Sequence, residues 1–124
     1  MQENLCNVSP DGDWITIAAP GQSGVTQEIT LSFSEASALA MTLPRWLKEA
    51  ISRKYADPSL RNVYPVREYI VECASDISSV LLTLAAGDGF DVVFGLDERM
   101  VTFLTRDLNG ARDLLGTHQP FRPH

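Results

Sequence analysis

Cysteine is scarce in this sequence, and its two occurrences exclude some classes of protein. Cys6 and Cys73 are the only cysteines among 124 residues, whereas small secreted domains usually carry several pairs that form disulfides. The two also lie too far apart in the sequence to match the spacing of a zinc motif. We therefore expect two reduced thiols, with Cys73 as a small residue of the core.

Long apolar runs and targeting signals are also missing. The longest apolar windows, residues 36–43 and 80–86, are far shorter than the ~20 residues that a membrane-spanning helix needs. Residues 1–7 are polar and contain Glu3, so they do not resemble a secretory signal. These features predict a cytoplasmic protein that does not contact a membrane.

Residues that usually carry catalysis or hold a metal are few. The only histidines are His118 and His124, near the C-terminal end, so a histidine-activated nucleophile is not expected. The glycines of 21–24 and 87–89 are typical of turns, because a phosphate-binding loop would add a Lys-Ser or Lys-Thr pair and a helix. The sequence favours a protein without catalysis, cofactor or bound metal.

The residues that are present have the composition of one globular domain. Hydrophobic residues make up 44% of the chain and charged residues 21%, which is typical of a folded domain. We predict a single α+β domain over residues 1–116. Residues 117–124 contain two prolines and no periodic pattern, so we expect a flexible C-terminal tail there.

Apolar periodicity divides this domain into strands and helices. Alternation of apolar and polar residues predicts strands, and a spacing of three or four predicts helices. Either Ser34 or Ser32 is suited to cap the first helix, and Ser32 with Glu35 fits a capping box there. Asp97 is suited to cap the second helix. The predicted architecture is an antiparallel sheet of about five strands, in the order ββ-α-βββ-α, with two helices packed on one face. The expected strands are residues 14–18, 25–33, 67–73, 79–84 and 90–95.

A short pattern recurs before each predicted helix. Residues 29–35 resemble residues 92–98, because each stretch alternates as a strand and then presents a capping residue followed by Glu. The repeat is compatible with pseudo-two-fold symmetry in the predicted sheet.

Charge is unevenly distributed along the chain. Acidic residues outnumber basic ones by 16 to 10, which gives a net charge of −6 and argues against nucleic-acid binding over the whole surface. Residues 45–67 have the opposite balance, with more basic than acidic residues, and the basic residues are interleaved with aromatic ones. This mixture is typical of protein interfaces, of nucleic-acid or phosphate contacts, and also of a basic helix end followed by a solvated loop. The predicted partner-binding residues are Trp46, Arg53, Tyr55, Arg61 and Tyr64.

Two glutamates supply an alternative candidate site. Glu68 and Glu72 lie on the same face of a predicted strand, with Ile70 between them. Paired carboxylates act as general acid and base when their surroundings separate their pKa values. One alternative is therefore a cofactor-free enzyme or ligand-binding protein that uses Glu68, Glu72 and Tyr69. The other is that the two glutamates lie on the solvent-facing side of an ordinary strand and have no chemical role.

The segment 80–86 is apolar on both faces. A sheet covered by helices on one side would leave Leu81 and Ile70 exposed, so either a second copy of the chain or the N-terminal hairpin would cover them. We expect a homodimer. The predicted function is a small acidic protein-protein interaction module, as an adaptor, chaperone-like protein or inhibitor, with an unknown protein partner. Nucleic-acid or phosphate binding through residues 45–67 is the remaining alternative.

Overall fold

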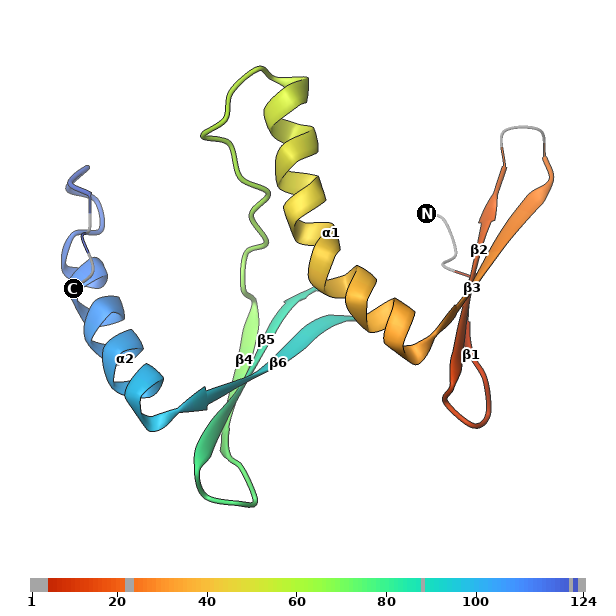
Figure 1. Cartoon of the computed structure of the whole chain (residues 1–124). Helices are drawn as coiled ribbons and strands as arrows, with labels where there is room; N and C mark the ends of the chain where they lie inside the picture. The colour runs from red at the N-terminus through yellow and green to blue at the C-terminus, as the bar shows by residue number, and fades with distance from the viewer. Residues whose placement is uncertain (1–4, 22–23, 88, 121, 123–124) are drawn as a thin grey trace. The chain divides into compact units, whose positions relative to one another are not determined.

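The chain builds two units of the same kind, each a three-stranded antiparallel sheet followed by a helix (Figure 1). The computed structural model describes residues 5–21, 24–87, 89–120 and 122. The first unit comprises Met1–Val63 and the second Tyr64–His124.

The first unit contains β1 (Leu5–Val8), β2 (Trp14–Pro20), β3 (Thr26–Ser32) and α1 (Phe33–Lys54). We call β1, β2 and β3 the N-terminal sheet; β2 is its central strand. The register aligns Ile15 with Leu31 and Ile17 with Ile29, so apolar side chains share one face. On the other face the hydroxyls of Thr16 and Thr30 lie 3.3 Å apart.

The start of α1 is fixed by a reciprocal pair of hydrogen bonds. The Glu35 backbone N–H donates to Ser32 Oγ (3.1 Å), and the Ser32 backbone N–H donates to Glu35 Oε1 (3.0 Å). This confirms the predicted capping box. Pro44 lies inside α1, which continues through it as one helix of 22 residues.

The second unit contains β4 (Glu68–Cys73), β5 (Ser79–Gly87), β6 (Phe90–Asp97) and α2 (Glu98–Asp113). We call β4, β5 and β6 the C-terminal sheet; β4 and β6 are its edges. The turn that the glycines of 87–89 predict joins β5 to β6 as a hairpin, with a register shift between Ala85 and Gly87. Asp97 caps α2 as predicted, since its Oδ1 accepts the Met100 N–H (2.7 Å).

The two faces of the C-terminal sheet differ in character. The register and the alternation of side chains separate an apolar face from a face that mixes carboxylates with apolar residues. The apolar face carries Tyr69, Val71, Cys73, Val80, Leu82, Leu84, Val92, Phe94 and Leu96. The mixed face carries Glu68, Ile70, Glu72, Leu81, Thr83, Ala85, Asp91, Val93 and Gly95.

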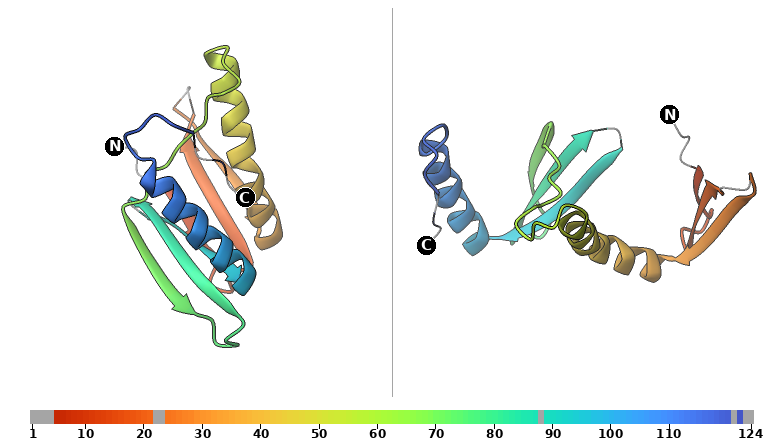
Figure 2. Two further views of the ribbon diagram at one scale, coloured as in Figure 1. Left: turned by 90° about the vertical axis from the view of Figure 1, so that its left-hand side faces the viewer. Right: turned by 90° about the horizontal axis from the view of Figure 1, so that it is seen from above.

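No described residue is buried, and this is the main departure from the predicted fold. Each helix continues from the last strand of its own sheet (Figure 2), and neither α1 nor α2 contains a buried residue among those described. The prediction that two helices pack on one face of a single five-stranded sheet is therefore wrong in detail, although the α+β class is confirmed. Cys73, expected in the core, is exposed, as is Cys6; both are free thiols.

Two further details correct the predicted order of elements. The structure adds β1, whose first three residues belong to the segment 1–7 that was described as polar. The helix caps are Ser32 and Asp97, so the two repeats align two residues away from the predicted alignment of 29–35 with 92–98. The single-domain assignment stays a prediction, and residues 121, 123 and 124 of the predicted tail lie outside the described residues.

Candidate protein-interaction surfaces

Three of the five predicted partner-binding residues lie on the C-terminal half of α1 or at its end. Trp46 and Tyr55 expose 59% and 60% of their surface. Arg53 reaches back one turn to Glu49, with 2.6 Å between Nη2 and Oε1, and the Lys54 ammonium lies 5.5 Å from the Tyr55 ring centroid. Exposed aromatic rings beside cations are typical of residues that dominate binding energy in protein interfaces.

The other two predicted residues lie outside α1. Arg61 is exposed in the segment that follows the helix. Tyr64 belongs to the second unit, where its ring stacks on Phe90 with 4.9 Å between centroids and 22° between planes. Tyr64 therefore contributes to packing within the second unit, and the pattern of alternating bases and aromatics does not distinguish that role from partner binding.

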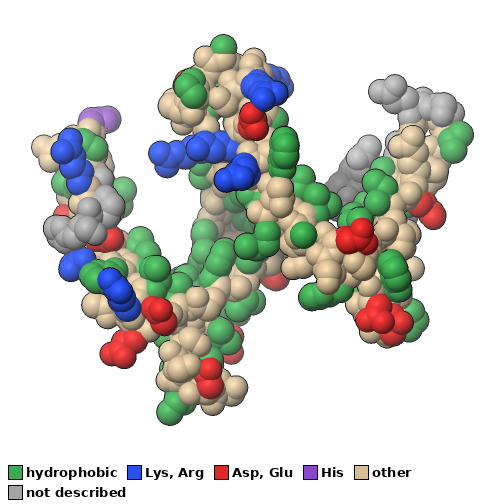
Figure 3. All heavy atoms as spheres, viewed as in Figure 1, with side chains coloured by type: hydrophobic (Ala, Val, Ile, Leu, Met, Phe, Trp, Pro, Cys, Tyr) green, Lys and Arg blue, Asp and Glu red, His purple; other side chains and the backbone are tan. Residues whose placement is uncertain are grey.

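Exposed apolar surface extends well beyond these residues (Figure 3). The apolar face of the C-terminal sheet is uncovered on its edge strands, where Tyr69, Val71 and Phe94 are all exposed. The apolar stripe of α1 consists of residues spaced three or four apart, and two of its members, Leu43 and Leu47, are exposed as well. Its residues are Ala36, Leu39, Ala40, Leu43, Leu47, Ala50 and Ile51. In each unit taken by itself, exposed apolar surface of this kind indicates a site of association, because monomeric proteins rarely leave large apolar patches in water.

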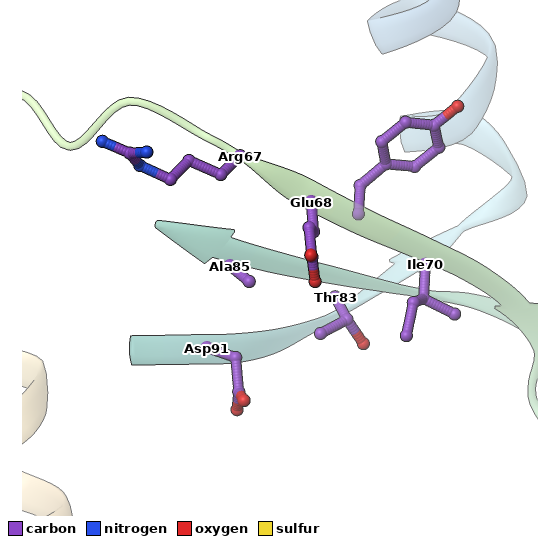
Figure 4. A pocket seen from close by; sticks show the side chains of 7 residues that line it. Arg67, Glu68, Ile70, Thr83, Ala85 and Asp91 are labelled. Atoms are coloured by element: carbon purple, nitrogen blue, oxygen red, sulfur yellow. The ribbon is translucent and has the colours of Figure 1, made fainter. Parts of the chain in front are cut away.

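A shallow hollow of about 440 Å³ lies over the mixed face at the start of β4. Figure 4 shows the side chains of Glu68, Thr83 and Asp91 on this face, with Arg67 beside the strand. Glu68, Ala85 and Asp91 form one row across the three strands. The hollow is thus open to solvent, and its charged lining residues are Glu68, Asp91 and Arg67.

The geometry does not favour an acid-base pair made of Glu68 and Glu72. Four residues along a strand separate their Cα atoms by about 13 Å, since each residue advances the chain by about 3.3 Å. Two carboxyl groups at that spacing do not share a proton. Tyr69 occupies the apolar face, opposite to both glutamates, so the three side chains do not converge on one site.

Among the residues that the structure describes, four carboxyl groups have lowered pKa values, and each one has a structural role in a turn or cap. The Ser9 hydroxyl donates to Asp11 Oδ1 (2.6 Å) and lowers the pKa of that carboxyl. Ser59 acts in the same way on Asp57, whereas the Ser78 and Ser32 backbone N–H groups are the largest cause of the lowered pKa of Asp76 and Glu35. These hydrogen bonds favour the ionised form.

The edge strand β6 of the C-terminal sheet is a feature that the sequence did not lead us to expect. The eight residues of β6 pair with β5 on one side, and no strand within the described parts of the chain pairs with its other side. Its sequence, FDVVFGLD, has neither lysine nor proline, the residues that often protect an edge from pairing. The run of apolar residues with no such protection was the signal that could have identified it.

Searches for other types of site and for related proteins gave negative results. Among the residues described, no cluster of three or more His, Cys, Asp or Glu side chains is placed to hold a metal ion. In the same residues, neither helix combines the length and apolar character needed to cross a lipid bilayer. Comparison with protein-family models, curated proteins and solved structures found no match to this chain.

Proposed function

We propose that this chain is a cytoplasmic protein-protein interaction module that works as a homodimer. Two copies cover apolar surface that one copy leaves in water, and the aromatic and basic end of α1 binds a further protein. The observation that carries the proposal is the lack of any buried residue among those described.

The amount of exposed surface supports association. The chain exposes 10981 Å². Two compact bodies sharing its mass of 13.7 kDa equally would together expose about 8000 Å². The remaining ~3000 Å² is far more than the ~800 Å² that each partner contributes to a standard interface. For two chains it amounts to about 6000 Å², at the upper end of what obligate homodimers bury in total.

The first test of this proposal is the mass of the chain in solution. Sedimentation equilibrium from about 1 to 100 μM should give twice 13.7 kDa, with dissociation only at the lowest concentrations. A mass of 13.7 kDa throughout would overturn the homodimer. A hydrophobic dye would then show whether the apolar faces are covered within one chain, in which case it should not bind.

The second test addresses the further partner. Immobilised protein should capture a discrete partner from nuclease-treated lysate at physiological salt. Trp46→Ala combined with Tyr55→Ala should reduce that capture at least about tenfold, as expected when interface aromatics are truncated. Met41→Ala is a matched control, because Met41 is an 82% exposed hydrophobic residue of α1 outside the apolar stripe. Equal loss in the control, or no loss in the double variant, would contradict the assignment.

A further inference from the structure

The edge strand β6 is the element best suited to join two copies of this chain. Of the four edge strands it is the longest, with eight residues against four in β1, seven in β3 and six in β4. Five of its eight residues are apolar, against two of seven in β3, and its longest run without a charged residue, Val92–Leu96, exceeds the three such residues of β4 between its two glutamates. A long apolar edge with unpaired backbone groups is a template for pairing with another strand.

Symmetry restricts how β6 can pair with its own copy. A two-fold axis perpendicular to the sheet leaves each face on the same side, so residues that oppose each other must come from the same face. The residue on the axis then opposes itself, and the candidate registers differ only in which residue lies there.

Charge and strand length select one register among these. Centring the axis on Phe94 would place Asp91 directly opposite Asp97 of the copy, and like charges in that position are destabilising. Centring it on Val92 would extend the pairing beyond the start of β6 at Phe90. Centring it on Val93 uses the strand from Phe90 to Leu96 and places no two acids opposite each other.

We propose that two copies of this chain pair antiparallel through β6, with the two-fold axis at Val93, and so form a continuous six-stranded sheet. Val92 then opposes Phe94 of the copy on the apolar face, and Phe90 opposes Leu96. On the mixed face Asp91 opposes Gly95, which has no side chain. Cross-strand pairs of an aromatic and a β-branched residue stabilise such contacts.

This inference rests on the proposed homodimer and names the contact that forms it. The backbone hydrogen bonds of β6 give the two copies a common register, and their apolar faces merge into one surface. The uncovered area of about 3000 Å² per chain exceeds what one strand pair buries. In the proposed dimer, other apolar elements of the two chains therefore pack on the combined apolar face of the six-stranded sheet.

A cysteine cross-linking experiment tests the register. In a Cys6→Ser, Cys73→Ser background, which removes both free thiols, Val93→Cys places the two introduced thiols directly opposite each other. Directly opposed residues have Cα atoms ~4.5–5.5 Å apart, within the range that a disulfide bridges. Mild oxidation should convert most of this variant to covalent dimer.

Two matched variants serve as controls. Ile70→Cys is at the other edge, in the same cross-strand row and on the same face, and its 55% exposure matches the 57% of Val93. Val92→Cys is on β6 but would be diagonal to its copy, beyond the ~7 Å limit for a disulfide. Both should cross-link at least roughly tenfold more slowly than Val93→Cys.

The outcomes separate this inference from the proposed homodimer. A dimeric parent with no preference for Val93→Cys overturns pairing through β6 and leaves the homodimer standing. A monomeric parent overturns both. Hydrogen exchange on the unmodified chain gives an independent answer, because raising the protein concentration should slow exchange in β6 but not in β4. Equal slowing in both strands would contradict the proposal.

Discussion

Tyr64 and Phe90 stack with 4.9 Å between their ring centroids, and this contact ties the segment before β4 to the start of β6. The two residues are far apart in sequence, and they belong to the same unit. Offset stacking of this kind contributes energy beyond the burial of area. The contact lies at the turn end of the β5–β6 hairpin, which carries the proposed dimer strand.

Removing the Tyr64 ring should weaken the second unit. We expect Tyr64→Ala to lower the free energy of unfolding by about 0.5–1.5 kcal/mol from the lost ring pair, measured by urea unfolding monitored at the far-ultraviolet circular dichroism band. Tyr55→Ala is the control, since Tyr55 is exposed at the end of α1 and stacks on no ring within the described residues. If both variants unfold at the same urea concentration, the stack has no structural role.

The capping box at α1 should make the helix sensitive to acid. The Ser32 backbone N–H, followed by the Ser32 hydroxyl, lowers the pKa of Glu35 below its ordinary value of 4.5. A carboxyl whose folded pKa is lowered contributes stability above its unfolded pKa and loses that contribution as the pH falls through the folded pKa. The stability difference between wild type and Glu35→Gln should therefore be constant near pH 7 and shrink below pH 4.5.

The same measurement on a second site separates this effect from general acid unfolding. Asp57, whose pKa is lowered by Ser59, is at a turn after α1, so Asp57→Asn should leave helix content unchanged while it alters the acid midpoint. Should the Glu35→Gln difference persist undiminished at pH 3, the ionised carboxylate would not be what stabilises the start of α1.

The cap of α2 should depend on an oxygen acceptor and not on charge alone. Asp97→Ala removes the acceptor for the Met100 N–H and should cost about 0.5–2 kcal/mol of stability. Asp97→Asn keeps an oxygen at the same place and should retain most of it. Equal losses for the two variants, measured by thermal unfolding, would show that the negative charge matters and that the hydrogen bond does not.

The local elements of this fold were predictable because short stretches of sequence determine them. Ser32 with Glu35, Asp97 and the glycines near 87–89 each satisfy or relax backbone groups within a few residues. Such signals do not depend on the rest of the chain. For this reason the helix starts and the hairpin are confirmed.

The long-range arrangement was not predictable from the same signals. Alternation assigned Cys73 to an apolar face correctly, but it could not say whether anything covers that face. The division into two sheets depends on which strand edges pair, and periodicity says nothing about edges. Tyr64 was assigned to an interface from the mixture of basic and aromatic residues around it, and that pattern gave no sign of the stack on Phe90, which is distant in the sequence.

The proposed register at β6 makes a prediction about charge. A Cβ atom added at Gly95 meets no other atom within 4 Å, so the backbone there leaves room for a side chain to begin. In the proposed dimer Gly95→Lys would place an ammonium opposite Asp91 of the copy, and the two-fold axis would create this pair twice. Cross-strand pairs of opposite charge contribute about 0.2–1 kcal/mol each, so the dissociation constant should fall roughly 2- to 30-fold. Gly95→Asp should raise it by a similar factor.

Asp91→Asn decides whether this change arises from the predicted pair. If the added lysine acts on Asp91 of the copy, combining Gly95→Lys with Asp91→Asn should remove most of the gain, since the two substitutions then depend on each other. The wild type, the two single variants and the double variant form a double-mutant cycle, and sedimentation equilibrium at low salt measures the dissociation constant of each. The coupling between the two substitutions should weaken at about 1 M salt. A gain that survives Asp91→Asn would place Gly95 opposite some other residue and refute the axis at Val93.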